Sequence, residues 1–293
     1  MNKSKWQCRW SPTLGSLEDT HQKIWGTDEY TDQERPTVFF GLYGLPDFYT
    51  LWRHKGERHI LWAGTDIIHF KNGYWLDTYG SIRIEKGKLA EWINRECTSW
   101  CENEVEQRML ATCGIEATVQ PSFLGDIEDF GVSFKSGNKV YASVSGDNYI
   151  QYGWRKILDL AIENPGVEFH LYGSSTTNPR KIFGSSSWPR VPGNINKVFF
   201  PKNILIHGRV PKEQMNAEIA EMQGGLRMTE FDGFSEITAK SILMGQWPIS
   251  LIEYPHVLKP NQISEILNKK EPNLEGREYY RKILNKYPWN SNI

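Results

Sequence analysis

The sequence predicts an α/β protein made of two halves, each a parallel β-sheet with helices around it. The chain has 293 residues, which is enough for two domains of ordinary size. In both halves, short apolar runs end at glycine and lead into amphipathic segments, the pattern of parallel strand–turn–helix units. Between these halves, residues 123–138 are glycine-rich and acidic, as in a linker.

The first half begins with a polar stretch over residues 1–35, in which tryptophans are scattered without a clear period and no regular element is expected. Residues 38–40 and 60–63 are short apolar runs that end at glycine, and we predict a strand at each. Between them, Asp47 is the expected N-cap of a helix that ends at residue 53.

Residues 86–115 are expected to be helical, with Gly114 ending the second of two helices. Cys97 and Cys101 lie four positions apart in this stretch, one helical turn, and this spacing would suit half of a metal site. No second pair of Cys or His follows at a zinc-like spacing, so we predict reduced thiols and no metal site. His54, a lone histidine, is expected to be a surface or packed residue and not a base.

The second half shows the same strand–helix pattern more clearly. Amphipathic helices are predicted at residues 153–166 and 211–222, and the tail over residues 260–293 is expected to be helical. Most of the predicted strands end in Gly, Ser or Thr, which let a ligand approach the backbone closely. Ligands of parallel sheets bind at the carboxyl ends of the strands, so these positions predict a shared binding site. The strands are expected at residues 139–146, 167–175, 203–210, 224–229 and 247–254.

One segment of the second half, TEFDGFSEITAKSILMGQWP, predicts a binding site for a phosphate next to hydroxyl groups. Ser235 is a good N-cap for a helix that ends near Met244. The first N–H groups of that helix have no partner within it and lie at the positive end of its dipole, so they can hold a phosphate. The carboxylate of Asp232 can accept hydrogen bonds from hydroxyls, as a sugar nucleotide would offer. The alternative is an ordinary capped helix.

These motifs resemble the retaining glycosyltransferases of the GT-B fold, in the group called glycosyl transferases group 1. That family has an acid-Gly-Phe-Gly turn before a helix, and here the turn is Asp232-Gly233-Phe234-Ser235. The segments VEFHLYGSS, NILIHGRVPKEQM and GGLRMT follow the family's order and spacing. A divergent branch with Arg-x-Thr before an Asp-Gly-x-Ser turn fits still better, through Arg227 and Thr229.

The resemblance implies a fold of two Rossmann-like parallel-sheet halves that face a cleft, with a shortened N-terminal half. Residues 1–133 would form the acceptor-side domain and residues 134–256 the nucleotide-sugar domain. Residues 257–293 would form a helical tail that packs back on the N-terminal half. The resemblance covers residues 139–255 well and the first half less well.

The resemblance also implies roles for individual residues. Asp232, Arg227 and Lys240 would be catalytic, with Asp232 near the donor sugar. On the acceptor side, the residues at predicted strand ends are Gly41, Gly44 and Asp66. The donor-binding residues would be Gly208, Arg209, Val210, Phe234, Ser235, Glu236, Ile237, Gly173 and Ser174.

Two departures from the family concern the donor site. The family's second acid is Lys240 here, and a lysine donates hydrogen bonds but accepts none. Glu236 lies four residues before it, so Lys240 has an i,i+4 partner that would make it structural. The family's Arg and Lys clamp on the diphosphate falls near Asp147 and Tyr152. Either Arg209, Arg227 or Lys240 takes over the phosphate charge, or the donor site has decayed.

Three classes of function therefore stand. The first is a glycosyltransferase that moves a sugar from a nucleotide-sugar donor to a glycan, lipid-linked or small-molecule acceptor, with retention and without a metal or cofactor. The second is a binding or scaffold protein on the same fold. The third is an unrelated nucleotide-dependent enzyme, and the sequence has neither GxxxxGK[ST] nor a convincing GxGxxG after a strand.

Charge and hydropathy set further expectations. The formal net charge of −1 gives no basic excess for nucleic-acid binding. No apolar run has the length of a signal peptide core or of a membrane span, so we expect a cytoplasmic protein without a transmembrane segment.

Overall fold

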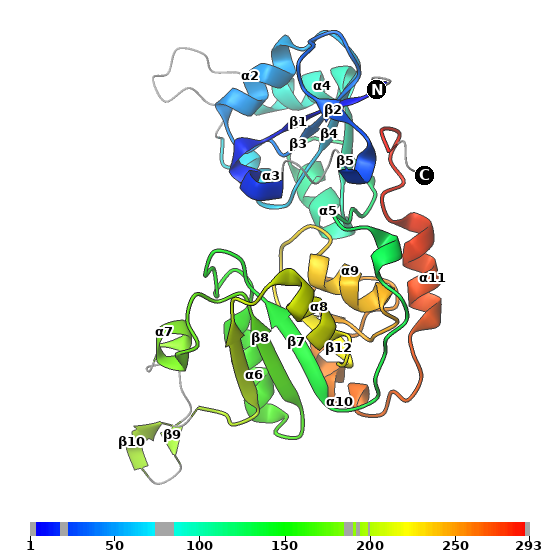
Figure 1. Cartoon of the computed structure of the whole chain (residues 1–293). Coiled ribbons are helices and arrows are strands. Elements are labelled where there is room, and N and C mark those ends of the chain that lie inside the picture. Colours follow the sequence, from blue (N-terminus) through cyan, green and yellow to red (C-terminus); the bar gives the residue numbers. More distant parts are fainter. Residues whose placement is uncertain are drawn as a thin grey trace. The chain divides into compact units, whose positions relative to one another are not determined.

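The computed structural model divides the chain into two compact units (Figure 1). It describes residues 4–17, 23–73, 85–184, 190–191, 194–198 and 200–290. The first unit contains Met1–Asp129, Phe231–Phe234 and Lys282–Ile293. The second contains Phe130–Glu230 and Ser235–Arg281.

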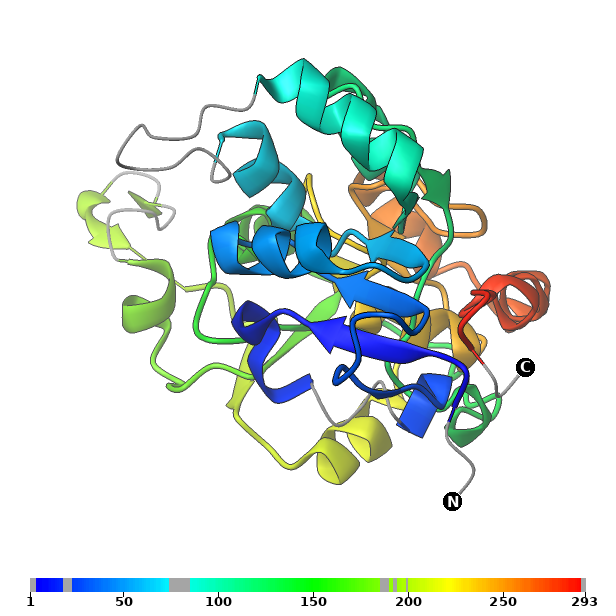
Figure 2. The same cartoon turned by 90° about the horizontal axis from the view of Figure 1, so that it is seen from above.

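The first unit is built on a parallel sheet with the strand order β2-β1-β3-β4-β5-β6. Figure 2 shows the neighbouring strands β1 and β3 as blue arrows that point the same way. The strands are β1 (Gln7–Trp10), β2 (Asp28–Glu29), β3 (Thr37–Phe40), β4 (Arg58–Leu61), β5 (Thr98–Cys101) and β6 (Thr118–Val119). The helices are α2 (Leu45–Arg53), α3 (Thr65–Lys71), α4 (Lys86–Glu96) and α5 (Glu104–Thr112).

Both faces of this sheet are buried, because successive side chains of a strand point to opposite faces. Phe39 belongs to one hydrophobic cluster, with Ile60 and Leu110. Phe40 belongs to the other, which is rich in tryptophan. A strand buried on both faces is continuously apolar, as TVFF is, and such strands are typical of parallel sheets.

Three expectations for this half were wrong. Residues 86–115 are not all helical, since β5 lies between α4 and α5. Its sequence TSWC has alternating burial and an aromatic residue that favours a strand, and Cys97 and Cys101 therefore do not share a helix face. The stretch expected to be irregular contains β1, which pairs with β3. The N-cap of α2 is Gly44, and Asp47 lies inside the helix.

The second unit is built on a parallel sheet with the strand order β11-β8-β7-β12-β13. Figure 1 shows β7, β8 and β12 side by side. The strands are β7 (Lys139–Ser143), β8 (Glu168–Tyr172), β11 (Ile204–Gly208), β12 (Gly224–Arg227) and β13 (Ile249–Ser250). All five lie within predicted strands, so the prediction of a parallel α/β sheet in this half is confirmed.

The helices of the second unit confirm the main amphipathic predictions. Trp154, Ile157 and Leu158 on one face of α6 are fully buried against Phe169 and Leu171 of β8. A short antiparallel pair, β9 (Arg190–Val191) and β10 (Asn194–Val198), lies apart from the main sheet. The helices are α6 (Trp154–Glu163), α7 (Pro179–Phe183), α8 (Lys212–Ile219), α9 (Glu236–Leu243), α10 (Ile263–Ile266) and α11 (Leu274–Ile283).

The end of the chain folds as part of the first unit. Trp289 is fully buried in the tryptophan-rich cluster, and its ring centroid lies 4.4 Å from that of Tyr287 in a stacked pair. The side-chain amide of Asn285 accepts the N–H of Phe123 at 2.9 Å and donates to the carbonyl of Phe123 at 2.8 Å. Several of the tryptophans are therefore core residues of this unit.

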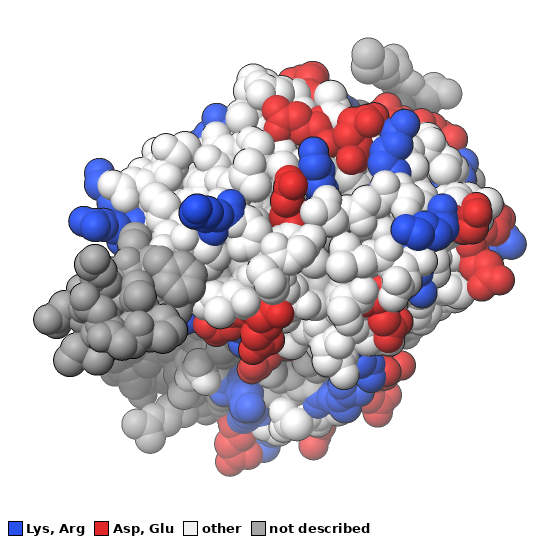
Figure 3. All heavy atoms as spheres, turned by 90° about the horizontal axis from the view of Figure 1, so that it is seen from below, with Lys and Arg blue, Asp and Glu red and all other residues white. Residues whose placement is uncertain are grey.

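The surface drawn in Figure 3 carries acidic and basic side chains in alternation, with broad uncharged areas between them. None of the helices in the described ranges has the length and the apolar character of a membrane span.

Candidate functional site

The carboxyl ends of β7, β8 and β11 lie at one edge of the second sheet, because all three strands are parallel. Gly173 follows β8 with a φ of +89°, and a Cβ there would lie 2.2 Å from the carbonyl oxygen of Val144. Only glycine fits this position, and its N–H donates to the carbonyl of Gly208 at 2.7 Å. The turns after the three strands therefore pack against each other.

Asp147 fixes two of these turns. Its carboxylate accepts the backbone N–H of Ser175 at 2.7 Å and the hydroxyl of Tyr149 at 2.8 Å. These hydrogen bonds, first those from Ser175, lower the pKa of the Asp147 carboxyl, and the charge of Arg209 adds to the effect. Asp147 also adopts a positive φ of 57°. A carboxylate thus stands where the family resemblance expects a cation.

Arg209 supplies positive charge at the same edge. It is exposed, and its Nε donates to the carbonyl of Gly173 at 3.2 Å. The next residue, Val210, is half-buried, whereas the Ser174 side chain is buried and donates to the carbonyl of Thr176 at 2.8 Å. The predicted donor-binding residues at the ends of β8 and β11 are therefore brought together.

Arg227 and Tyr152 form a second cationic feature of this unit. The guanidinium carbon of Arg227, the last residue of β12, lies 4.0 Å from the centroid of the Tyr152 ring. Such stacking orients a guanidinium and keeps its charge. Tyr152 precedes α6, so a turn after β7 and a strand end of β12 meet here.

The helix α9 begins as predicted at Ser235, whose Oγ accepts the N–H of Thr238 at 3.4 Å. Within the described part of the chain, the N–H groups of Ser235, Glu236 and Ile237 donate no hydrogen bond to the protein. These groups form the positive end of the helix dipole. Lys240 is buried, and its Nζ lies 3.0 Å from Oε1 of Glu236, so the expected i,i+4 ion pair is present.

The segment Phe231–Phe234 folds with the first unit. Asn103 donates its side-chain amide to the carbonyl of Asp232 at 2.7 Å, and the N–H of Phe234 donates to Oε2 of Glu102 at 2.9 Å. The hydroxyl of Ser122 donates to the other oxygen of Glu102. The N–H of Phe234 was expected to bind the nucleotide-sugar donor. In this structure it donates its hydrogen bond to the carboxylate of Glu102 instead.

Glu102 and Glu106 form a buried carboxyl pair beside this segment. Glu106 is completely buried, and its Oε2 accepts the N–H of Glu102 at 2.7 Å. Burial raises the pKa of Glu102 to about 8 and raises that of Glu106 well above its usual range, and the charges of the neighbouring carboxylates add to both shifts. No basic side chain in the described ranges pairs with either group.

The residues predicted for the acceptor side lie at strand ends of the first unit. Gly41 follows β3 with a φ of +77°, and Gly44 caps α2. Asp66 is completely buried, and its carboxylate accepts the N–H groups of Leu42, Ala63 and Ile67 at 3.0, 3.0 and 2.9 Å. Burial raises its pKa to about 7. In this arrangement Asp66 joins two turns and presents no oxygen at the surface.

Glu102, Asn103 and Glu106 were not predicted as site residues, because residues 86–115 were expected to be helical. Had TSWC been recognised as a strand, Glu102 and Asn103 would have stood at its carboxyl end, where functional residues of parallel sheets gather. His54, expected to be a surface or packed residue, is fully buried against Phe39 and Tyr30.

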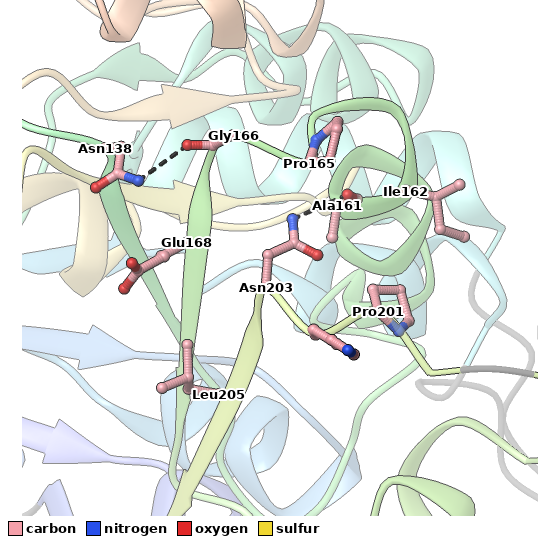
Figure 4. A pocket seen from close by; sticks show the side chains of 10 residues that line it. Asn138, Ala161, Ile162, Pro165, Gly166, Glu168, Pro201, Asn203 and Leu205 are labelled. Carbon is pink, nitrogen blue, oxygen red and sulfur yellow. Dashed lines mark hydrogen bonds between the residues drawn. The ribbon is translucent and has the colours of Figure 1, made fainter.

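A separate pocket of about 670 Å³ lies at the opposite edge of the second sheet (Figure 4). Asn138, Glu168 and Asn203, at the amino ends of β7, β8 and β11, line it together with the end of α6. Asn138 donates to the carbonyl of Gly166 at 2.9 Å, and Asn203 to that of Ala161 at 3.0 Å. These bonds hold turns and the helix end, and no predicted site residue lines the pocket.

Comparison with known proteins identifies the fold. No family model matches the sequence, and no curated protein matches it. Among solved structures, S. aureus TarM in complex with fondaparinux, alpha-GlcNAc-glycerol and UDP has a TM-score of 0.57 and 12% identity, over 94% of this chain and 56% of that one. Sucrose-phosphate synthase from Thermosynechococcus elongatus has a TM-score of 0.58 and 11% identity, over 92% of this chain and 73% of that one.

The chain has the GT-B fold. This confirms the predicted fold class of two Rossmann-like parallel-sheet halves. An alpha,alpha-trehalose-6-phosphate synthase from Burkholderia multivorans is also similar, with a TM-score of 0.52 and 9% identity, over 86% of this chain and 67% of that one. The chain spans 56% of the length of the TarM chain.

Proposed function

We propose that this protein is a glycosyltransferase that moves a sugar from a nucleotide-sugar donor to an acceptor hydroxyl, with retention and without a metal. The observation that carries the proposal is the similarity in fold, over nearly the whole chain, to glycosyltransferases such as TarM, whose structure contains UDP. Fold alone does not fix a reaction, so the proposal also depends on the residues at the expected donor positions.

The nucleotide is expected at the carboxyl edge of the second sheet. Gly173, Ser174 and Gly208 leave the backbone accessible there, and Arg209 and Val210 follow β11. The base and ribose of a nucleotide need backbone approach and hydrogen-bonding groups, which these turns supply. We assign this edge to the nucleoside part of the donor.

The diphosphate is expected at the start of α9. The N–H groups of Ser235, Glu236 and Ile237 are directed out of the helix start and suit phosphate oxygens. Asp147 and Tyr152 stand near the positions of the family's Arg and Lys clamp on the diphosphate. The positive charge would therefore come from Arg209, Arg227 and Lys240 instead. These groups stabilise the charge of the departing diphosphate, which is the main electrostatic requirement of the reaction.

The sugar is expected near Asp232, whose carboxylate can accept hydrogen bonds from hydroxyls. Bond cleavage passes through an oxocarbenium-like transition state, and the leaving phosphate itself would take the acceptor proton. The acceptor would be a glycan, a lipid-linked or a small-molecule hydroxyl that meets the turns at Gly41 and Gly44 of the first unit. The buried carboxylate of Asp66 would shape these turns and not contact the acceptor.

A second candidate is a binding or scaffold protein on the same fold. Two observations favour it: Lys240 is paired with Glu236, and the Asp147 carboxylate stands at the expected clamp position. The two candidates differ in turnover, because a binding protein would release no nucleoside diphosphate.

Nucleoside diphosphate release from UDP-, GDP- and ADP-sugars tests the proposal, with and without EDTA and over a panel of glycan and small-molecule acceptors. We expect release with one donor class, unchanged by EDTA and lost in Asp232→Ala. Binding of a nucleotide with no release from any donor would favour the second candidate. The anomeric configuration of the product tests retention.

A further inference from the structure

The turn Asp232–Phe234 is held from one side by two consecutive residues that follow β5. Asn103 donates to the carbonyl of Asp232 at 2.7 Å, and Glu102 accepts the N–H of Phe234 at 2.9 Å. The two bonds act on residues at either end of a three-residue turn. They therefore fix its position and its rotation together, which one bond would not do.

Gly233, in the middle of the turn, fits closely against Glu102. A Cβ at this position would lie 1.8 Å from Oε2 of Glu102, so any larger residue would have to displace that carboxyl group. On the other side, the N–H of Gly233 comes within 3.4 Å of where a Cβ of Gly64 would stand, and Gly64 has a φ of +86°. Two glycines and a glutamate thus form one tightly packed unit around the turn.

Keeping Glu102 in this place is costly for the fold. Glu102 is 8% exposed and Glu106 0% exposed, and neither has a basic partner among the described residues. A buried carboxyl pair without a cation contributes little to stability, and apolar residues of similar volume often replace such groups without loss. A role in placing the turn explains why carboxyl groups occupy this position.

We propose that Glu102 is a positioning residue of the donor site: it holds the Asp232–Phe234 turn so that Asp232 and the following start of α9 can engage the donor, and Glu106 and Asn103 support it. The assignment of the turn to the donor site rests on the proposed function. The contact between Glu102 and the turn does not.

The hydrogen bonds explain how Glu102 would act through its neighbours. Ser122 donates to one oxygen of Glu102, and Phe234 donates to the other, so the carboxyl group is held at both ends. Glu106 receives the N–H of Glu102 with one oxygen. Its other oxygen, Oε1, is buried without a hydrogen-bond partner among the described residues and lies beside Gly64.

The ionisation of Glu102 would then change the strength of its hydrogen bond with the N–H of Phe234. An ionised carboxylate accepts a hydrogen bond more strongly than a neutral carboxyl group. Since the pKa of Glu102 is raised to about 8, its charge changes near neutral pH. Glu102 and Glu106 interact electrostatically with five other titratable groups. These are Asp66, Asp232, Cys101, Tyr43 and Tyr287.

Hydrogen exchange of the Phe234 amide, measured at single-residue resolution in the full chain, tests the contact. Glu102→Ala removes the acceptor, and we expect the amide to exchange about tenfold faster or more. Glu102→Gln keeps an acceptor oxygen of the same shape, so it should restore most of the protection. Glu104→Ala, at an exposed position at the start of α5, is the matched control and should change nothing. Equal protection in Glu102→Ala and in the wild type would overturn the contact.

Calorimetric titration of the same variants with UDP, GDP and ADP tests the role in the donor site. Glu102→Ala should weaken the affinity of the preferred nucleotide about tenfold, with Glu102→Gln closer to the wild type. Faster exchange of Phe234 with unchanged affinity would overturn the positioning role and leave a structural contact. A wild-type protein that binds none of the three nucleotides would contradict the proposed function instead, while the exchange experiment still decides the contact.

A second variant keeps the test valid if Glu102→Ala does not fold. Asn103 caps α5 by accepting the N–H of Glu106, and the serine of Asn103→Ser can keep this cap. The shorter serine side chain no longer reaches the carbonyl of Asp232. We expect weaker nucleotide binding in a variant that still unfolds in one cooperative transition, at a somewhat lower melting temperature because one hydrogen bond of the buried Asn103 is lost. Unchanged binding in this folded variant would argue against the positioning of the turn by these residues.

Discussion

Arg227 lies over the ring of Tyr152, with the guanidinium carbon 4.0 Å from the ring centroid. The pair joins the end of β12 to the turn before α6 in the second unit. A stacked guanidinium keeps its full charge and its hydrogen-bonding edge, so the ring orients a cation without neutralising it.

Arg227 is therefore expected to need its aromatic partner. Tyr152→Phe should keep the affinity for the preferred nucleoside diphosphate, whereas Tyr152→Leu should weaken it by about 1 kcal/mol, the usual contribution of a cation–π contact. Calorimetry on the two variants measures this difference. Arg155→Ala, which removes an exposed arginine of α6, is the control. Equal affinities in the Phe and Leu variants would mean that the stacking has no part in binding.

Variants of Lys240 and Glu236 test two explanations of the altered donor site. Either Lys240 binds phosphate, or it serves only as the structural partner of Glu236. Glu236 is more than half exposed but Lys240 is buried, so Glu236→Gln should destabilise the protein, because it leaves a buried ammonium group without its charged partner. Lys240→Met keeps the apolar stem and removes the charge. If Lys240 contributes to phosphate binding, Lys240→Met weakens nucleotide affinity and Glu236→Gln does not. An equal effect of both variants on affinity would identify Lys240 as the structural partner of Glu236.

The buried carboxyl groups predict a stability that falls as pH rises. Burial raises the pKa of Glu102 to about 8 and that of Asp66 to about 7, so the folded protein keeps protons that the unfolded chain has released. Between about pH 5 and pH 7 the free energy of unfolding should fall by up to roughly 1.4 kcal/mol per pH unit for each such proton. Above about pH 8 these groups add no further slope.

Urea denaturation across this range measures the slope. Glu102→Gln removes one titrating group, so its slope should be shallower than that of the wild type. Glu104→Gln removes an exposed carboxylate and should leave the slope unchanged. A Glu102→Gln variant with the full wild-type slope would show that Glu102 is ionised at neutral pH despite its burial.

Gly233 and Glu102 should show strong energetic coupling. Gly233→Ala places a Cβ against Oε2 of Glu102 and should destabilise the protein by about 1–3 kcal/mol, as overpacking does. In the Glu102→Ala background the same substitution should cost much less, because the clashing oxygen is gone. Thermal denaturation of the four proteins of this cycle gives the coupling. Additive effects would contradict the close packing of the turn.

The second unit was predictable because local sequence and fold agree there. KVYAS and EFHLY are apolar strands that end at small residues, and Ser235 caps α9 as its sequence indicates. The fold class followed from this half and from the strands predicted at residues 38–40 and 60–63 in the other.

The first unit was less predictable, because tertiary pairing decides its short strands. TSWC lies between two helical segments and forms β5 only by pairing with β4 and β6. QCRW forms β1 by pairing with β3 and β2. Missing β5 hid Glu102 and Asn103, whose partners lie about 130 positions later in the chain, at a separation that no local pattern reveals.

The central claim is a working donor site in the second unit, and its most direct test is calorimetric titration of the full chain with UDP, GDP and ADP. The account predicts saturable binding of one of these nucleotides, weakened about tenfold or more by Arg209→Ala and unchanged by Arg155→Ala. Absence of binding to all three, in a protein that is folded by its melting transition, would contradict the account.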